Sequence, residues 1–326
     1  MSIRIDAAPR AVEGSLNWGN HMKPWLKWTL RILAALIVLA AAGYWWLLIE
    51  SGTPPGTYKI DLAEVRALAS SLPGEPPAEA RVETIGEAHF PSVAVTAGDG
   101  WSPTPMTFFA YELVFPDGVG IVDTGMDKAD AAQMNAARFD DAAFQRVTAA
   151  MTAAKFVVVT HEHQDHIGGL LKHPQLKAVL AHTILNPQQA RDNTGMMTTI
   201  TWPAGALDGY KPADYNPYLA IAPGVVLIRA PGHTEGSQLV YVRLASGREI
   251  LFIGDVAWKR RNIDEVRERA RLITWLMNED RGKVLDELAE LKRIAAENPD
   301  LVIVPGHDGA VIDALVASGV MTAGFR

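Results

Sequence analysis

Three histidines and one aspartate lie within six residues of one another, at His161, His163, Asp165 and His166. Imidazole nitrogens and carboxylate oxygens are common ligands of divalent metal ions. On an extended backbone, His161 and His163 point to the same side of the chain, where one ion can bind both. Asp165 and His166 follow after the chain turns, and glycines 168–169 allow close backbone packing as a helix starts, so these two side chains can face a second ion. The ligands suit zinc, although iron, manganese and cobalt also accept them.

Histidine and aspartate recur later in the chain, each within a few residues of a short apolar run. Such runs, rich in β-branched residues, are typical of buried strands, and the run 156–160 leads into the histidine cluster in the same way. The repetition sets these residues apart from His21, His89, His173 and His182, which have no such neighbours and are expected to be structural or exposed. The recurring residues are His233 after 225–228, Asp255 after 250–253 and His307 after 301–304.

Strand and helix patterns alternate around these residues. Residues 107–115 and 119–122 read as two strands joined by a hairpin at 116–118, and Asp123 follows directly. Residues 282–297 place apolar side chains on one helical face, which suits packing against a sheet. The alternation, with a further strand at 239–242, predicts a layered α/β domain.

These motifs resemble those of the metallo-β-lactamase-fold superfamily, whose signature His-x-His-x-Asp-His is matched by residues 161–166. The resemblance covers roughly residues 81–310 and implies an αββα sandwich. Four further segments are similar to the family's other motifs, in the same order: 121–125, 231–236, 253–255 and 305–307.

The resemblance implies a dinuclear zinc site that needs no protein nucleophile. Two divalent ions about 3.5–4 Å apart acidify a water held between them, and the resulting hydroxide attacks a carbonyl or phosphoryl group. Asp165 would also relay a proton, and Asp123 would support the ligands without binding an ion itself. The implied ligands are His161, His163 and His233 for one ion, Asp165, His166 and His307 for the other, and Asp255 for both.

The motif spacing is most similar to that of acyl-homoserine lactonases and related esterases, with 67 residues from His166 to His233 and 22 from His233 to Asp255. Asp255 argues against a true β-lactamase, which lacks this acid. The lactonases often carry a tyrosine three residues after the bridging aspartate to position the substrate carbonyl, where this chain has Trp258. Tryptophan offers one N–H donor and a larger apolar ring, so either the substrate differs or another group takes that role. Large apolar residues beside the motifs are candidates to line a pocket: Trp101, Met106, Met196, Met197, Trp202 and Trp258.

An apolar, uncharged run at 32–49 precedes this domain. As a helix it would be about 27 Å long, close to the thickness of a hydrocarbon core. Basic residues dominate before the run, so the positive-inside rule keeps the N-terminus in the cytoplasm and the catalytic domain outside, in the periplasm if the cell is bacterial. Cleavage of a signal peptide near residues 40–42, which would release a secreted enzyme, is the alternative. The expected organisation is a cytoplasmic segment at 1–31, a transmembrane anchor at 32–49, a linker with a short helical stretch at 50–80 and a catalytic domain at 81–326.

Composition excludes several classes of protein. The chain has 326 residues, of which 48% are hydrophobic, enough for a substantial core. The formal net charge of −7 provides no basic surface for nucleic acid. The absence of cysteine excludes disulfides and thiolate metal ligands. The sequence leaves the oligomeric state open.

The sequence therefore predicts a membrane-anchored zinc hydrolase of a small-molecule ester or lactone. Two alternatives use the same residues: a phosphodiester or organophosphate hydrolase, and a mononuclear iron oxidoreductase of the sulfur dioxygenase type, in which Asp165 or His307 would have no metal to bind. A third alternative is a membrane-anchored binding protein without catalytic activity. Metal analysis and substrate profiling distinguish these functions.

Overall fold

A computed structural model of the chain describes residues 22–195 and 199–326. The chain divides into two compact units between Trp45 and Trp46, and the larger unit is Trp46–Arg326.

Helix α1 (Pro24–Tyr44) forms most of the described part of the smaller unit and continues into one π-helical turn, η1 (Trp45–Ile49). Proline lies in the first turn of α1, where its missing N–H breaks no helical hydrogen bond. The helix starts at Pro24 and not at residue 32, because Lys27, Leu30 and Arg31 are good helix formers and continue the helix beyond the uncharged run towards the N-terminus. By length and composition, Pro24–Ile49 is a candidate membrane span or signal sequence.

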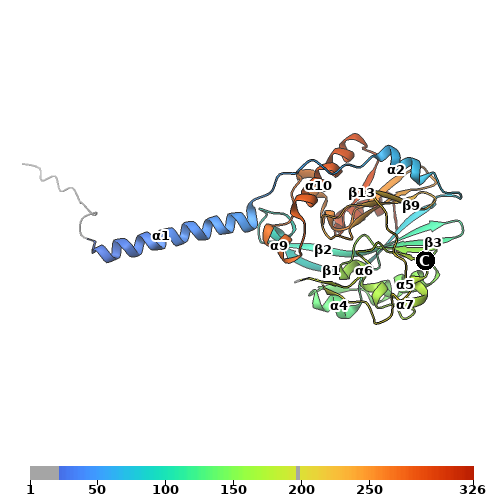
Figure 1. Ribbon diagram of the computed structural model, residues 1–326, viewed down its shortest axis with the longest axis horizontal. Coiled ribbons are helices and arrows are strands. Elements are labelled where there is room, and N and C mark those ends of the chain that lie inside the picture. Colours follow the sequence, from blue (N-terminus) through green and yellow to red (C-terminus); the bar gives the residue numbers. More distant parts are fainter. Residues whose placement is uncertain (1–21, 196–198) are drawn as a thin grey trace, which may run out of the picture. The chain divides into compact units, whose positions relative to one another are not determined.

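The larger unit is a sandwich of two mixed sheets (Figure 1). The first sheet has the strand order β14-β1-β2-β3-β5-β6, with β4 paired to β1, and the second has the order β13-β12-β11-β10-β9. The first contains β1 (Glu79–Pro91), β2 (Pro103–Phe115), β3 (Gly118–Val122), β4 (Arg138–Phe139), β5 (Phe156–Val158), β6 (Thr183–Ile184) and β14 (Thr322–Ala323). The second contains β9 (Tyr218–Ala222), β10 (Val225–Arg229), β11 (Gln238–Arg243), β12 (Glu249–Phe252) and β13 (Val302–Val304), and a separate ribbon pairs β7 (Asn193–Thr194) with β8 (Thr199–Ile200).

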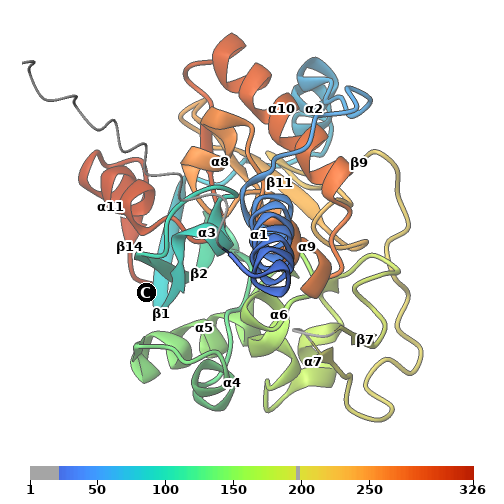
Figure 2. The same cartoon turned by 90° about the vertical axis from the view of Figure 1, so that its left-hand side faces the viewer.

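Helices cover the outer face of each sheet, so the layers follow the order αββα. Figures 1 and 2 both show α2 and α10 on one side of the sandwich and α4, α5 and α7 on the other. A buried cluster that includes Phe109, Leu227 and Val240 fills the space between the sheets. The helices are α2 (Leu62–Ala69), α3 (Ser92–Val95), α4 (Lys128–Gln133), α5 (Asp141–Ala153), α6 (Gln164–Leu171), α7 (Leu176–Leu180), η2 (Gly254–Val256), α8 (Arg260–Glu265), α9 (Arg271–Leu276), α10 (Arg281–Glu297) and α11 (Gly309–Ala317).

The predicted elements are found with small shifts of their ends. Helix α10 begins after Asp280, whose carboxylate accepts from the backbone N–H of Lys283, and its predicted apolar face is buried against the second sheet. The hairpin between β2 and β3 pairs Phe115 with Gly118, and Gly118 has φ of 147°, a conformation that favours glycine. The sequence thus predicts the layered α/β class and the αββα sandwich correctly.

The segment between η1 and α2 belongs to the larger unit and packs against α10. The Asp286 carboxylate of α10 accepts hydrogen bonds from the backbone N–H groups of Gly56, Thr57 and Tyr58, at 2.5–2.7 Å. Glu290, one turn further along α10, accepts from the N–H of Ile60 at 2.9 Å. These bonds fix part of the expected linker to the helix layer of the second sheet.

Candidate metal centre

The loop between β5 and α6 carries His161 and His163, and the first turn of α6 carries Asp165 and His166. The chain reverses here because α6 packs very closely on the loop after β3. A side chain at Gly169 would collide with the backbone carbonyl of Thr124, so only glycine allows this approach. The close packing brings the start of α6 to the same edge of the sandwich as the ends of the strands.

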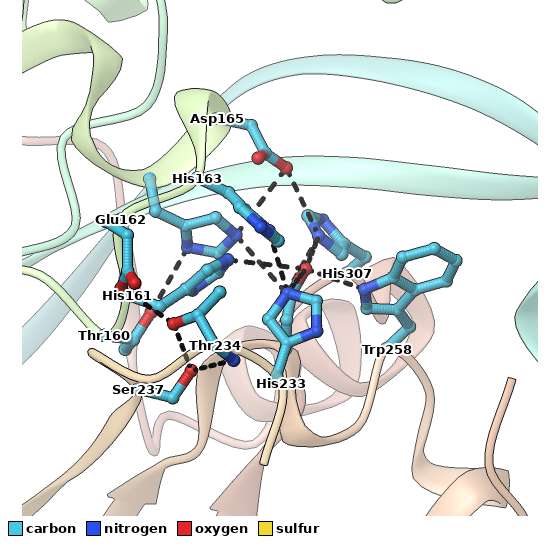
Figure 3. Close-up of polar contacts among 12 residues, drawn as sticks. Thr160, His161, Glu162, His163, Asp165, His233, Thr234, Ser237, Trp258 and His307 are labelled. Carbon is cyan, nitrogen blue, oxygen red and sulfur yellow. Dashed lines mark hydrogen bonds and ion pairs between the residues drawn. The ribbon is translucent and has the colours of Figure 1, made fainter. Parts of the chain in front are cut away.

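The three later residues meet this loop at the same edge. His233 follows β10, Asp255 lies in the η2 turn after β12, and His307 follows β13. All the predicted ligands are buried, with at most 7% of any residue exposed. Their side chains point towards one another, as Figure 3 shows for the labelled histidines and Asp165.

The ligand atoms form two groups of the kind that can hold a metal ion. His161, His163, His233 and Asp255 make up one group, and Asp165, His166, Asp255 and His307 make up the other. Within each group these atoms lie within 4.8 Å of one another. We call them the His233 group and the His307 group.

Asp255 belongs to both groups and directs a different oxygen at each. Its Oδ2 lies 3.4 Å from Nε2 of His233, while its Oδ1 lies 3.3 Å from Nε2 of His166 and 3.0 Å from Nε2 of His307. A carboxylate in this position can bind one ion through each oxygen.

The donor atoms fit metal ions better than they fit one another. Nε2 of His161, Nε2 of His166 and Oδ1 of Asp255 are buried without a hydrogen-bond partner among the described residues. Burial lowers the pKa of His161 and of His163 well below the usual range, so both imidazoles are neutral and keep a free lone pair. Burial alone would raise the pKa of Asp255, but the neighbouring imidazoles of His307 and His166 hold it well below its usual range. Burial alone would lower the pKa of His166, but the charges of Asp123 and Asp165 raise it well above the usual range, so an ion binding this ring would displace a proton. His161 and His163 already have the neutral form that binds zinc.

Asp123 supports the His307 group from the end of β3. Its Oδ2 lies 2.9 Å from Nδ1 of His166, and its Oδ1 accepts from the backbone N–H of Thr160 at 2.6 Å. Asp123 has φ of 58°, a left-handed conformation that aspartate tolerates better than most residues. Outer partners of this kind fix the ring orientation of a metal-binding histidine. His307 has a backbone partner instead, because its Nδ1 lies 3.0 Å from the carbonyl oxygen of Thr107.

The His233 group is supported by two residues that sequence reasoning missed, Glu279 and Arg269. Oε1 of Glu279 lies 2.6 Å from Nδ1 of His233 and 2.7 Å from Nε of Arg269. Arg269 is 1% exposed, and its guanidinium lies 4.7 Å from the ring centroid of Trp258. Both residues come from the segment around α9, outside every recognisable motif. Each is a single charged residue among many in that segment, so the sequence contains no signal that could have identified them.

Thr234 and Ser237 act in the loop structure. Their hydroxyl oxygens lie 2.9 Å apart, and Thr234 donates to Glu162 at 2.7 Å (Figure 3). Glu162, which lies between His161 and His163 in the sequence, is buried and also accepts from the N–H of Gly236. This hydrogen-bond network ties the loop of residues 161–166 to the loop that carries His233.

Trp258 is buried, and its indole N–H donates to Oδ2 of Asp255 at 2.7 Å. Its polar atom is therefore engaged with a predicted metal ligand, while the ring faces an apolar cavity that Trp101 also lines. Met106 packs against Trp258, and Trp202 packs in a different buried cluster under the first sheet. Met196 and Met197 lie outside the described residues.

Known proteins resemble this chain in sequence and in fold. A "probable metallo-hydrolase" of Mycobacterium tuberculosis is 29% identical over 226 residues, which cover 59% of this chain and 71% of the relative. Among solved structures, an N-acyl homoserine lactone hydrolase with N-hexanoyl-L-homoserine bound at its catalytic metal centre aligns with a TM-score of 0.57 and 16% identity, over 74% of this chain and 97% of that one. A "probable metal-dependent hydrolase" from Staphylococcus aureus aligns with a TM-score of 0.51 and 11% identity, over 71% of this chain and 90% of that one. At these identities the structural matches establish a shared fold.

A sequence model of one family matches residues 109–307, a segment that contains every predicted metal ligand. The match covers more than half of the chain. With its αββα sandwich and its two groups of buried ligands, the chain belongs to the metallo-beta-lactamase superfamily.

Proposed function

We propose that this protein is a dinuclear zinc hydrolase that cleaves an ester or lactone, with an acyl-homoserine lactone as one candidate substrate. The observation that best supports this proposal is the position of Asp255, whose two carboxylate oxygens face the two ligand groups. Superfamily membership and a relative named as a metallo-hydrolase support a metal-dependent hydrolase. The fold shared with a lactone hydrolase that holds its product at a metal centre supports the ester or lactone class.

The bound ions would supply Lewis-acid chemistry, polarising the substrate carbonyl and making a water molecule acidic near neutral pH. The protein's part is to hold the two groups close together and largely shielded from solvent. His161, His163 and His233 would offer ring nitrogens to one ion, and His166 and His307 would offer theirs to the other. Trp258 donates to Oδ2 of Asp255 and thereby fixes the orientation of the shared carboxylate.

Asp165 is the residue that we assign to proton transfer. Its Oδ2 lies 3.4 Å from Nε2 of His307, and at 7% it is the most exposed of the predicted ligands. A carboxylate at the edge of the centre can take a proton from the attacking water and pass it to the leaving oxygen.

A polar cavity of about 150 Å³ reaches the His233 group and is lined by His163, His233, Arg191 and Asn278. Its lining groups can hydrogen-bond a polar substrate head beside the predicted ligands. We assign this cavity to the reacting part of the substrate.

The decisive experiment uses the full chain in lipid nanodiscs, with bound metal counted per chain and a panel of esters, lactones, β-lactams and phosphodiesters. We expect two zinc ions and turnover of esters or lactones. Asp255→Ala should abolish turnover and reduce the metal count, whereas Asp313→Ala, at an exposed position on α11, should change neither. One bound iron with oxygen consumption on thiol substrates would overturn the proposal, as would turnover of phosphodiesters alone.

We further propose that α1 remains as a membrane anchor, with the N-terminus in the cytoplasm and the catalytic unit outside. The apolar length of Pro24–Ile49 and the basic residues before and within its first turns support this orientation. Because the natural sequence has no cysteine, Ser2→Cys and Ser318→Cys report on the two sides without background. In intact cells a membrane-impermeant maleimide should label the second variant only. Labelling of both, or loss of the N-terminal segment from the mature protein, would overturn the anchor.

A further inference from the structure

An apolar cavity of about 240 Å³ lies within the larger unit, beside the candidate metal centre. Every described residue that lines it is apolar, including Phe90 before α3, Val93 on α3, and Leu272 and Ile273 on α9. A cavity without hydrogen-bonding groups has no means of holding a polar ligand or an ordered water. Its lining matches a hydrocarbon chain.

Trp258 joins this cavity to the metal centre. One part of the residue lines the cavity, and its indole nitrogen donates to Asp255, the carboxylate shared by both ligand groups. Figure 3 shows the indole nitrogen turned towards the cluster and the six-membered ring turned away from it. Arg269 and Phe90 pack on the ring, with Phe90 at a centroid distance of 5.9 Å. A chain in the cavity therefore lies one indole ring away from the proposed reaction centre.

The apolar cavity and the polar cavity share the α9 region as a wall. Ile273 lines the apolar cavity, and Met277, one helical turn later, lines the polar one. Both side chains pack against the same small cluster as Trp258. The arrangement fits an amphiphile whose polar head binds at the metal centre and whose chain extends past α9.

The rim of the apolar cavity is connected to the candidate membrane span. Leu48 lines the cavity and is also the penultimate residue of Pro24–Ile49. The last residues of that span, 46–49, belong to the larger unit, in which the carbonyl of Leu48 accepts from the N–H of Gly98 and the ring of Trp46 packs edge-on against Trp275.

Two exposed apolar side chains, Trp101 and Leu272, line the cavity, and a third, Trp275, packs on Trp46, which is close to Leu48 in the chain. Trp101 is 61% exposed, Trp275 is 52% exposed and Leu272 is 37% exposed. Tryptophan is enriched where a protein meets the membrane surface, because its ring is apolar and its N–H is polar.

We propose that the apolar cavity binds the hydrocarbon chain of an ester or lactone dissolved in the membrane, and that the chain enters beside Leu48. The reaction itself rests on the proposed function, but chain binding does not. Each methylene moved from water into an apolar site gains about 0.8 kcal/mol, so kcat/KM measured against aqueous substrate should rise about fourfold per added methylene until the cavity is full.

Photo-crosslinking tests chain binding without any need for metal or turnover. An octadecyl alcohol with a diazirine at the chain end is placed in nanodiscs that contain the full chain, and labelled peptides are mapped by mass spectrometry. We expect labels in residues 90–101 and 272–273 in addition to α1. Ala94→Trp, which fills a half-buried position in the cavity lining, should remove the cavity labels and leave those on α1 as an internal control. Ala129→Trp, at an exposed position on α4, should change neither.

The outcomes separate the two proposals. Labels confined to α1 would overturn chain binding, whatever the hydrolase assays show. Cavity labels in a protein that hydrolyses nothing would support chain binding and overturn the proposed function. Equally rapid cavity labelling from probe held in separate nanodiscs would overturn entry from the membrane. With ester substrates, the ratio of long-chain to short-chain kcat/KM should fall at least about tenfold in Ala94→Trp, since about two methylenes lose their site.

Discussion

His166 and His233 lie in different ligand groups, and a carboxylate holds the outer nitrogen of each, yet the two carboxylates are supported in different ways. Asp123 lies at the end of β3, next to the loop that it supports, and accepts from the neutral N–H of Thr160. Glu279 follows α9 and pairs with Arg269, a guanidinium that is almost wholly buried.

The two kinds of support differ in how much stability the protein loses when the carboxylate is replaced. With a metal ion on its other nitrogen, His166 is a neutral donor to Asp123. A carboxylate that accepts from neutral donors can be replaced by an amide with the loss of hydrogen bonds worth about 1–3 kcal/mol. A buried ion pair is stable only while both partners are present, and removal of one leaves an uncompensated charge at about 3–5 kcal/mol. The His233 group therefore depends on its support for stability as well as for orientation.

Removal of one ligand from each group should have the largest effect. His233→Ala and His307→Ala each leave Asp255 and the opposite group intact. We expect each variant to retain one ion per chain and to lose more than the 10–100-fold in activity that is typical of an outer partner. Metal analysis of the purified proteins, together with ester kinetics, checks this. Two ions retained by either variant would show that its histidine is not a ligand.

Replacement of the supporting carboxylate should destabilise the protein more at the His233 group than at the His307 group. Glu279→Gln strands the Arg269 charge and should cost about 3–5 kcal/mol, whereas Asp123→Asn should cost about 1–3 kcal/mol, since asparagine also tolerates a left-handed backbone. Each should weaken zinc binding about 10–100-fold. Thermal unfolding of both variants with and without zinc gives the comparison. The double variant Glu279→Gln, Arg269→Met should recover stability, and equal losses in the two single variants would contradict the distinction.

Trp258→Phe tests whether the hydrogen bond to the shared carboxylate of Asp255 contributes to turnover. The change removes the N–H that donates to Asp255 and keeps an aromatic ring beside Arg269. We expect kcat to fall about tenfold, the lower end of the range for outer partners. Trp202→Phe is the matched control, because it also loses an indole hydrogen bond, to the carbonyl of Gln189, but lies outside the centre. A similar loss of kcat in both variants would point to general destabilisation.

The smallest effect concerns Glu287, a second buried acid on the His233 side that packs against Gly232. Burial raises the pKa of Glu287 well above its usual range. The folded protein therefore keeps this proton after the unfolded chain has lost its own, and stability falls as pH rises from about 4.3 through the raised pKa. Glu287→Gln should flatten that slope and stabilise the protein at pH 7. Unfolding measured from pH 5 to 8 should show this, and an unchanged slope would contradict it.

The proposed ligands can be picked out from sequence because each belongs to a local pattern, a metal-binding residue type placed a few residues after an apolar run. Asp123 is predictable for the same reason, since it follows β3 within a short motif. Glu279 is not, because its contact with His233 spans 46 residues of sequence and depends on how α9 packs. The proposed ligands and Asp123 can therefore be identified from local sequence patterns. The support of the His233 group by Glu279 depends on tertiary packing and cannot.

The strand β1 shows the same limit for the fold. Ala80 and Val82 follow the two-residue alternation of a strand, but the buried positions then shift to Ile85 and Ala88. The cause is a bulge between Thr84 and Gly86, which adds a residue and moves later side chains to the opposite face. A pattern of period two cannot detect a strand whose register changes along its length.

Arg269 touches both the carboxylate that holds His233 and the tryptophan that borders the apolar cavity. Substitutions that reshape the cavity around Trp258 for a new substrate will therefore also disturb Arg269, which stabilises the His233 group. We expect specificity and metal retention to evolve together in this protein, with gains on bulkier substrates accompanied by a greater demand for zinc. Variants of the cavity wall away from Trp258, such as Val93 or Leu272, offer a route that avoids this coupling.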